Sequence, residues 1–195
     1  MALTSSMMLP LGTAAPDFSL SDPATGEIVS LADFESKKAL LVTFICNHCP
    51  FVKHVADSFA ELVTEYQSKG VGVAAIMSND VANHPDDGPD KMAQEKIARR
   101  YLFPYLYDET QEAAKSFRAA CTPDYFIFDA EQKLVYRGQM DDSRPDNGIP
   151  VSGQDLRAAL DALIDGRPVP VEQIPSIGCN IKWKPGNEPD YLTAT

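Results

Sequence analysis

Two cysteines three positions apart, Cys46 and Cys49, followed at once by Pro50, are the feature that most constrains the fold of this chain. The residues before the pair, 39–45, are apolar and partly β-branched, which predicts a buried parallel strand. The residues after the pair place apolar side chains on one helical face: Phe51, Val52, Val55, Phe59, Leu62, Val63 and Tyr66. We therefore expect the cysteines on the turn between a strand and a helix.

The chemistry expected of a cysteine pair at such a turn is thiol–disulfide exchange. The N-terminal end of a helix carries about half a positive charge, which stabilises a thiolate. A second thiol close by can capture a mixed disulfide without a second molecule. These two properties predict a reversible disulfide between Cys46 and Cys49, formed without a cofactor.

A second motif lies far downstream, where Thr122 and Pro123 precede an alternating aromatic strand predicted for residues 124–128. Proline has no backbone N–H, so it is tolerated at the start of a strand, where its peptide bond can be cis. The opening segment 11–20, the C-x-x-C turn and this Thr-Pro strand occur in the order seen in the thioredoxin superfamily. More closely, the chain resembles the peroxiredoxin-like proteins of the alkyl hydroperoxide reductase and thiol-specific antioxidant (redoxin) group that keep a C-x-x-C motif.

The resemblance implies an α/β class and a thioredoxin-like fold, with a central mixed β-sheet flanked by helices and an N-terminal extension. We expect one domain over residues 1–195, with a core of about 10–166 and an irregular C-terminal tail of about 167–195. In this fold a cis-proline loop packs against the redox cysteines. The resemblance therefore implies that Thr122 and Pro123 present their backbone to the substrate.

The position of Pro50 bears on which cysteine attacks. In peroxiredoxins a proline directly follows the reactive cysteine, as Pro50 follows Cys49 here. Proline also suits the first position of a helix, which places Cys49 at the N-cap, where the dipole acts most strongly. We predict that Cys49 is the nucleophile and Cys46 the resolving thiol. The conventional reverse order is the alternative.

Two departures from the peroxiredoxin pattern affect the expected activity. Cys46 stands where that pattern has a threonine, and Pro123 stands where it has an arginine. In peroxiredoxins those two groups polarise the peroxide and hold it in line. The main prediction is therefore a thiol–disulfide oxidoreductase that acts on a disulfide-containing protein or a small-molecule disulfide and is restored by an external thiol. A thiol-dependent peroxidase with a peroxide substrate is the alternative.

Two further classes of function compete with redox chemistry. A metal-binding or metal-delivery protein would use Cys46, Cys49 and a histidine, either His48 or His54. A structural zinc site takes four ligands, usually as two close pairs, and this chain has one close cysteine pair, so we expect no bound metal. The other class is a redox-inactive interaction module. His48 is predicted to be an exposed spacer, and His84 with its acidic loop a solvated surface.

The remaining cysteines, Cys121 and Cys179, are possible additional redox thiols. Cys121 lies two residues before Pro123 and is equally well explained as a buried small apolar residue. Cys179 resembles the C-terminal resolving cysteine of some peroxiredoxins. The interpretation that we favour is that Ile181 and Trp183 simply anchor the tail to the core.

Helix starts can be placed at three other points. Asp90 and Asp108 each precede a helical pattern and are predicted to cap it. The segment 152–155 fits a capping box that opens a last helix.

Charge and composition limit the partners and the location. A net charge of −11 disfavours nucleic acid and anionic membrane surfaces. Residues 1–12 contain no Lys or Arg, so they lack the basic region of a signal peptide. No apolar run approaches the ~20 residues of a membrane-spanning helix. Four cysteines are too few for a disulfide scaffold of this size, which predicts a reducing, cytoplasmic location.

Overall fold

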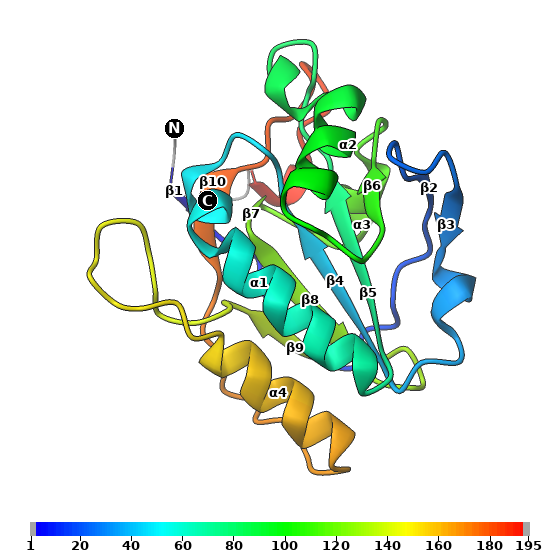
Figure 1. The fold of residues 1–195 in the computed structure, drawn as a ribbon, viewed down its shortest axis with the longest axis vertical. Coiled ribbons are helices and arrows are strands. Elements are labelled where there is room, and N and C mark those ends of the chain that lie inside the picture. Colours follow the sequence, from blue (N-terminus) through cyan, green and yellow to red (C-terminus); the bar gives the residue numbers. More distant parts are fainter. Residues whose placement is uncertain (1–2, 193–195) are drawn as a thin grey trace.

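A mixed β-sheet forms the centre of the computed structural model, which describes residues 3–192 (Figure 1). Its seven strands follow the order β3 (Ile28–Ser30), β2 (Ser19–Ser21), β6 (Tyr105–Tyr107), β5 (Val71–Met77), β4 (Ala39–Phe44), β8 (Asp124–Phe128) and β9 (Leu134–Gly138). Strands β4, β5 and β6 are parallel, whereas β8 is antiparallel to β4 and β9 to β8. The α/β class with a central mixed sheet is confirmed.

Two hydrophobic layers sandwich this sheet because its central strands are buried on both faces. Leu41 and Val73 belong to the layer shared with helices α1 (Pro50–Ser68) and α4 (Gln154–Ile164). Leu40 and Val42 point the other way, toward α3 (Glu112–Ser116) and the short helix η1 (Leu31–Phe34). Helix α2 (Pro89–Ala98) and the short helix η2 (Pro85–Asp87) follow β5 (Figure 1).

A second, three-stranded sheet corrects the prediction of an irregular C-terminal tail. Strand β10 (Ile177–Asn180) pairs antiparallel with both β1 (Leu3–Ser5) and β7 (Cys121–Thr122). These partners lie far away in the sequence, so no local pattern around β10 marks it as a strand. The anchoring role of Ile181 and Trp183 is confirmed, since Ile181 is 1% exposed and Trp183 packs on the same core layer. The chain then reaches η3 (Asp190–Leu192).

The helix starts agree only in part with the predicted caps. The N-cap of α3 is Gln111, not Asp108, although the carboxylate of Asp108 accepts hydrogen bonds from the backbone N–H groups of Ala113 and Ala114 in its first turn. Helix α2 begins at Pro89 with Gly88, not Asp90, as its N-cap. Helix α4 is capped by Gly153 in a left-handed conformation. The predicted capping box is absent there because Asp155 binds the side chain of Gln139 instead.

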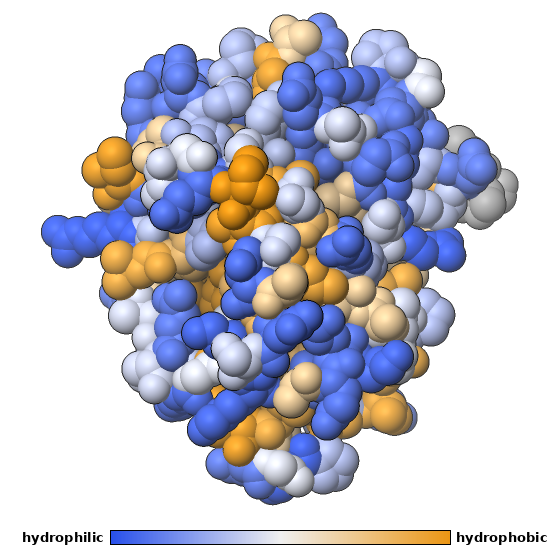
Figure 2. Space-filling view, turned by 90° about the vertical axis from the view of Figure 1, so that its right-hand side faces the viewer, coloured by the Kyte–Doolittle hydropathy of each residue, from blue (hydrophilic) through white to orange (hydrophobic). Residues whose placement is uncertain are grey.

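The molecular face on the side of β2 and β3 is mainly hydrophilic, with hydrophobic patches interrupted by polar side chains (Figure 2). Of the helices within residues 3–192, none combines the length and the apolar character needed to cross a bilayer.

Candidate functional site

The register of the strands brings the C-x-x-C turn and the Thr-Pro loop together. Phe44, at the end of β4, pairs with Asp124, at the start of β8. The turn that follows β4 therefore lies against the residues that precede β8, which are Thr122 and Pro123. The peptide bond between those two residues is cis. The C-x-x-C turn and the Thr-Pro loop thus meet at one edge of the sheet.

Cys49 occupies the N-cap of α1, directly before Pro50 at the first helical position. Its side chain is fully buried, and its Sγ lies 3.2 Å from the backbone carbonyl oxygen of Thr122, which can accept its proton. A hydrogen bond from the Cys46 thiol, helped by others from Thr122 and Cys179, outweighs burial and lowers the pKa of Cys49 to about 4. These contacts favour the thiolate form of Cys49 over that of Cys46.

Cys46 lies in the turn after β4 and is 2% exposed. Its Sγ is 3.5 Å from the Thr122 hydroxyl oxygen and 3.8 Å from Nδ1 of His48. The hydrogen bond to Cys49, together with burial, raises the pKa of Cys46 well above the usual thiol value. The contact between the two sulfurs thus shifts the two pKa values in opposite directions, down for Cys49 and up for Cys46.

The buried carboxylate of Asp87 fixes the C-x-x-C turn through hydrogen bonds. The sequence patterns did not predict this role for Asp87. Its Oδ1 accepts from the backbone N–H of Asn47 at 2.8 Å, and its Oδ2 accepts from Nδ1 of His48 at 2.6 Å and from Asn79 at 2.8 Å. Burial opposes its charge, but the hydrogen bonds from His48 and Asn79 prevail and keep the pKa of Asp87 below its usual value.

Two predictions about this region are therefore wrong. His48 is no exposed spacer, since its side chain is 18% exposed and pairs with Asp87. The loop around His84 is not simply solvated surface, because Asp87 is 0% exposed and the His84 ring stacks on His48 with centroids 5.1 Å apart. The polar composition of residues 78–89 does not indicate burial. Asp87 is buried because its hydrogen-bond partners lie in the C-x-x-C turn, far away in the sequence.

Three potential metal ligands, from Cys46, His48 and Asp87, lie within 4.8 Å of one another. However, Nδ1 of His48 and Oδ2 of Asp87 are 2.6 Å apart, which is a hydrogen-bond distance. Two ligand atoms of a tetrahedral zinc ion are farther apart, roughly 3.3 Å, because each bond is about 2.0 Å long. The pair is thus arranged as a hydrogen-bonded dyad. The other candidate histidine, His54, instead contacts the Ser143 hydroxyl at 2.7 Å.

The two remaining cysteines occupy different positions relative to the pair. Cys121 is fully buried, its Sγ is 3.8 Å from the Pro123 carbonyl oxygen, and burial raises its pKa well above the usual value. Cys179, on β10, pairs with Thr122 across the small sheet, and burial together with the nearby Cys49 raises its pKa to about 12. The structure therefore brings Cys179, and not Cys121, into contact with the nucleophile candidate.

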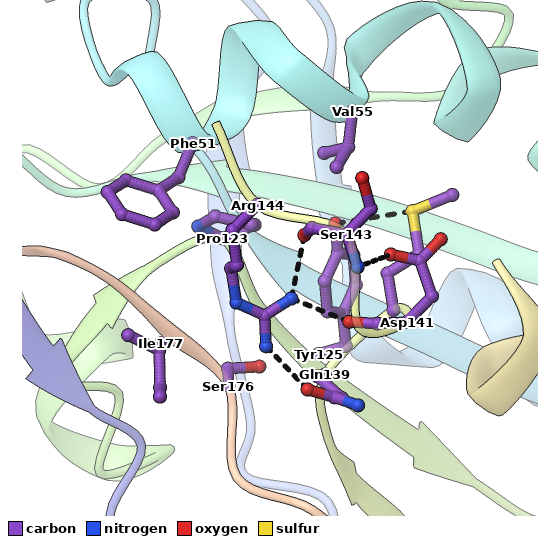
Figure 3. A pocket seen from close by; sticks show the side chains of 11 residues that line it. Phe51, Val55, Pro123, Tyr125, Gln139, Asp141, Ser143, Arg144, Ser176 and Ile177 are labelled. Carbon is purple, nitrogen blue, oxygen red and sulfur yellow. Dashed lines mark hydrogen bonds between the residues drawn. The ribbon is translucent and has the colours of Figure 1, made fainter. Parts of the chain in front are cut away.

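A small pocket of about 20 Å³ opens beside Pro123 (Figure 3). Phe51 and Val55 of α1 line one side, and Arg144 lies opposite. Hydrogen bonds from the Arg144 guanidinium to the side chain of Gln139 and to two backbone carbonyls hold it in place. The pocket is thus lined by the first turns of α1, by Pro123 of the proline loop and by the positively charged side chain of Arg144.

The comparison with protein families matches residues 10–153 to the family described as Redoxin. This chain belongs to the Redoxin family. Over 95% of this redoxin and 98% of an uncharacterized conserved protein from Geobacillus kaustophilus, the two structures agree with a TM-score of 0.93 and 56% sequence identity. A hypothetical protein from Sinorhizobium meliloti is 49% identical over 94% of this chain and all of its own, with a TM-score of 0.92.

A more distant structure confirms the thioredoxin fold of this redoxin. The thioredoxin domain of a thiol-disulfide oxidoreductase from Bacteroides vulgatus has a TM-score of 0.57 at 19% identity. The match covers 71% of this chain and 91% of that domain. At this identity the likeness concerns the fold alone.

Proposed function

We propose that this redoxin is a thiol–disulfide oxidoreductase in which Cys49 is the nucleophile and Cys46 the resolving thiol. The observation that carries the proposal is geometric, because Cys49 is the N-cap of α1 directly before Pro50 and both redox sulfurs contact Thr122 of the proline loop. Cys49 sits at the start of α1 with its pKa lowered to about 4, chiefly by the hydrogen bond from Cys46. A thiolate, and not a thiol, is the attacking species in disulfide exchange.

The reaction follows from this arrangement. The Cys49 thiolate attacks one sulfur of a substrate disulfide, forms a mixed disulfide and releases the other substrate sulfur as a thiolate. Cys46 then gives up its proton and attacks Cys49 Sγ, which forms the Cys46–Cys49 disulfide and expels the second substrate thiolate. The two substrate thiolates take up the proton from Cys46 and one from solvent. Two electrons pass from the protein to the substrate, and an external thiol returns them.

Thr122 and Pro123 serve as the substrate-binding loop in this proposal. The hydroxyl and the carbonyl of Thr122 already contact the two redox sulfurs, at 3.5 Å and 3.2 Å. The pocket beside Pro123 adds apolar surface next to the first turn of α1 (Figure 3). Both cysteines are shielded from solvent, so a substrate must displace part of this loop before it reaches Cys49.

Alkylation of variants that each lack one cysteine of the pair, with the modified residue located by peptide mapping, tests the assignment. With Cys46→Ser, the remaining Cys49 should react with iodoacetamide at pH 6, because the N-cap position still favours its thiolate. With Cys49→Ser, Cys46 should be nearly inert at pH 6 and the protein should not reduce oxidised glutathione. Faster reaction of Cys46 at that pH would reverse the roles. The same variants assayed with hydrogen peroxide decide whether peroxide is also a substrate.

A further inference from the structure

A third thiol faces the redox pair from the C-terminal strand. In an antiparallel pair, directly opposite residues place their side chains on the same face of the sheet. Cys179 is opposite Thr122, whose hydroxyl points to Cys46. Cys121 is opposite Asn180 and, being the neighbour of Thr122 along the strand, points to the other face. The register therefore directs Cys179 toward the pair and Cys121 away from it.

Close packing of the strands brings Cys179 to the site. A Cβ atom added at Gly178 would collide with the carbonyl oxygen of Thr122, so only glycine lets β10 approach β7 this closely. Cys179 is 2% exposed and packs in the same core layer as Cys46 and Cys49. Its thiol lies close enough to the sulfur of Cys49 to help lower the pKa of Cys49. Cys49 thus has a thiol neighbour on each of two separate elements.

We propose that Cys179 is a second resolving thiol for Cys49, so that the protein forms a Cys49–Cys179 disulfide in competition with the Cys46–Cys49 disulfide. The inference rests on the proposed function, because it starts from the same mixed disulfide on Cys49. Such a bond would link the first turn of α1 covalently to the C-terminal strand. Oxidation of Cys49 would then constrain the position of β10 and its pairing with β7.

The step is balanced without any further reagent. After Cys49 has attacked a disulfide substrate, Cys179 loses its proton and its thiolate attacks Cys49 Sγ. The Cys49–Cys179 bond forms while the bond between Cys49 and the substrate sulfur breaks. The departing substrate thiolate takes up the proton from Cys179. As with Cys46, two protein thiols are oxidised and one substrate disulfide is reduced to two thiols.

Oxidised glutathione is the probe, and variants that lack Cys46 isolate the proposed route. In Cys46→Ser, Cys49 should form a glutathione adduct that decays as the Cys49–Cys179 disulfide appears by peptide mapping. The adduct should persist at least roughly tenfold longer in Cys46→Ser/Cys179→Ser, because the intramolecular attack is lost. The matched control is Cys46→Ser/Cys121→Ser, in which the adduct should decay as in Cys46→Ser.

Equal adduct lifetimes in Cys46→Ser and in Cys46→Ser/Cys179→Ser would overturn the inference while leaving the proposed function intact. Failure of the wild-type protein to form any disulfide on Cys49 would instead refute the proposed function. If the Cys46→Ser variants do not fold by circular dichroism, mapping of the wild-type protein in a glutathione redox buffer decides the question. A Cys49–Cys179 peptide supports the inference, and its absence beside an abundant Cys46–Cys49 peptide overturns it.

Discussion

Cys49 Sγ and the backbone carbonyl oxygen of Thr122 lie 3.2 Å apart although 73 positions separate the two residues. The hydroxyl of the same threonine is 3.5 Å from Cys46 Sγ. One residue of the proline loop therefore touches both thiols with different groups. Its backbone contact would survive substitution, whereas its hydroxyl contact would not, which makes the side-chain contribution measurable.

Replacing Thr122 with Val should raise the pKa at which the thiol pair first ionises. Valine keeps the shape of threonine but removes the hydroxyl, which lies 3.5 Å from Cys46 Sγ and favours the charged form of the pair. A hydrogen bond to a charged group contributes about 1.5–3 kcal/mol, so the thiolate titration should move up by about one to two pH units. Thiolate absorbance near the ultraviolet edge, followed against pH, measures it. Thr122→Ser should titrate like the wild type, and an unchanged Thr122→Val curve would contradict the hydroxyl contact.

Replacing Asp87 with Ala should destabilise the protein by about 3 kcal/mol, because the substitution leaves several buried donors without an acceptor. The donors are the backbone N–H groups of Asn47 and His48, the His48 ring and the Asn79 amide. Urea denaturation at pH 7 gives the free energy of unfolding. Asp57→Ala, which removes an exposed ion pair with Arg99, should cost less than ~1 kcal/mol.

The carboxylate of Asp87 should also affect how steeply the free energy of unfolding falls at acidic pH. The pKa of Asp87 is lower in the folded protein than in the unfolded chain, so its stabilising effect is present above the unfolded value. This stabilisation is lost as the pH falls below about 4, the pKa of an aspartate in the unfolded chain, and then through the lower pKa of Asp87 in the folded protein. The Asp87→Ala variant should therefore lose less stability than the wild type on acidification. A parallel loss in both proteins would show that Asp87 is not charged in the fold.

Replacing Asp124 with Asn should flatten the decline of stability between about pH 4 and pH 8. Burial of the carboxyl group, whose two oxygens accept no hydrogen bond within residues 3–192, raises the pKa of Asp124 to about 8. The folded protein then holds a proton that the unfolded chain has released above about pH 4, so the free energy of unfolding falls as the pH rises through this window. Asparagine is neutral at every pH and removes this slope. Urea titrations at pH 5, 6.5 and 8 compare the two slopes, and identical slopes would mean that Asp124 is ionised when buried.

Replacing Gly178 with Ala should push β10 away from β7 and cost about 1–3 kcal/mol, as overpacking of a close contact does. The added Cβ would meet the carbonyl oxygen of Thr122, which is backbone and cannot move aside alone. Thermal unfolding measures the loss. Val171→Ala, on an exposed part of the same C-terminal segment, should change stability by less than ~0.5 kcal/mol. A fully stable Gly178→Ala protein would refute the close approach of the two strands.

Local patterns in the sequence determined the elements that surround the cysteines. The apolar run before Cys46 became β4, and the apolar stripe after Pro50 became α1, with Cys49 as its N-cap. These features depend on residues within a few positions of one another, through side-chain periodicity and the fixed geometry of proline. The pairing of the Thr-Pro loop with the cysteine turn was predicted from a family resemblance, since nothing local specifies it.

Only the tertiary structure decided what lies around the two thiols. Asp87 is buried because distant donors in the C-x-x-C turn compensate its charge, although its own neighbours in sequence are polar. Cys179 reaches Cys49 because β10 takes its register from β7, a strand more than fifty residues earlier. Burial of a charge and the register of a strand are set by partners that the local sequence does not contain. For that reason the sequence alone predicted the pair of Cys46 and Cys49, whereas the carboxylate of Asp87 and the third thiol, Cys179, emerged only from the tertiary structure.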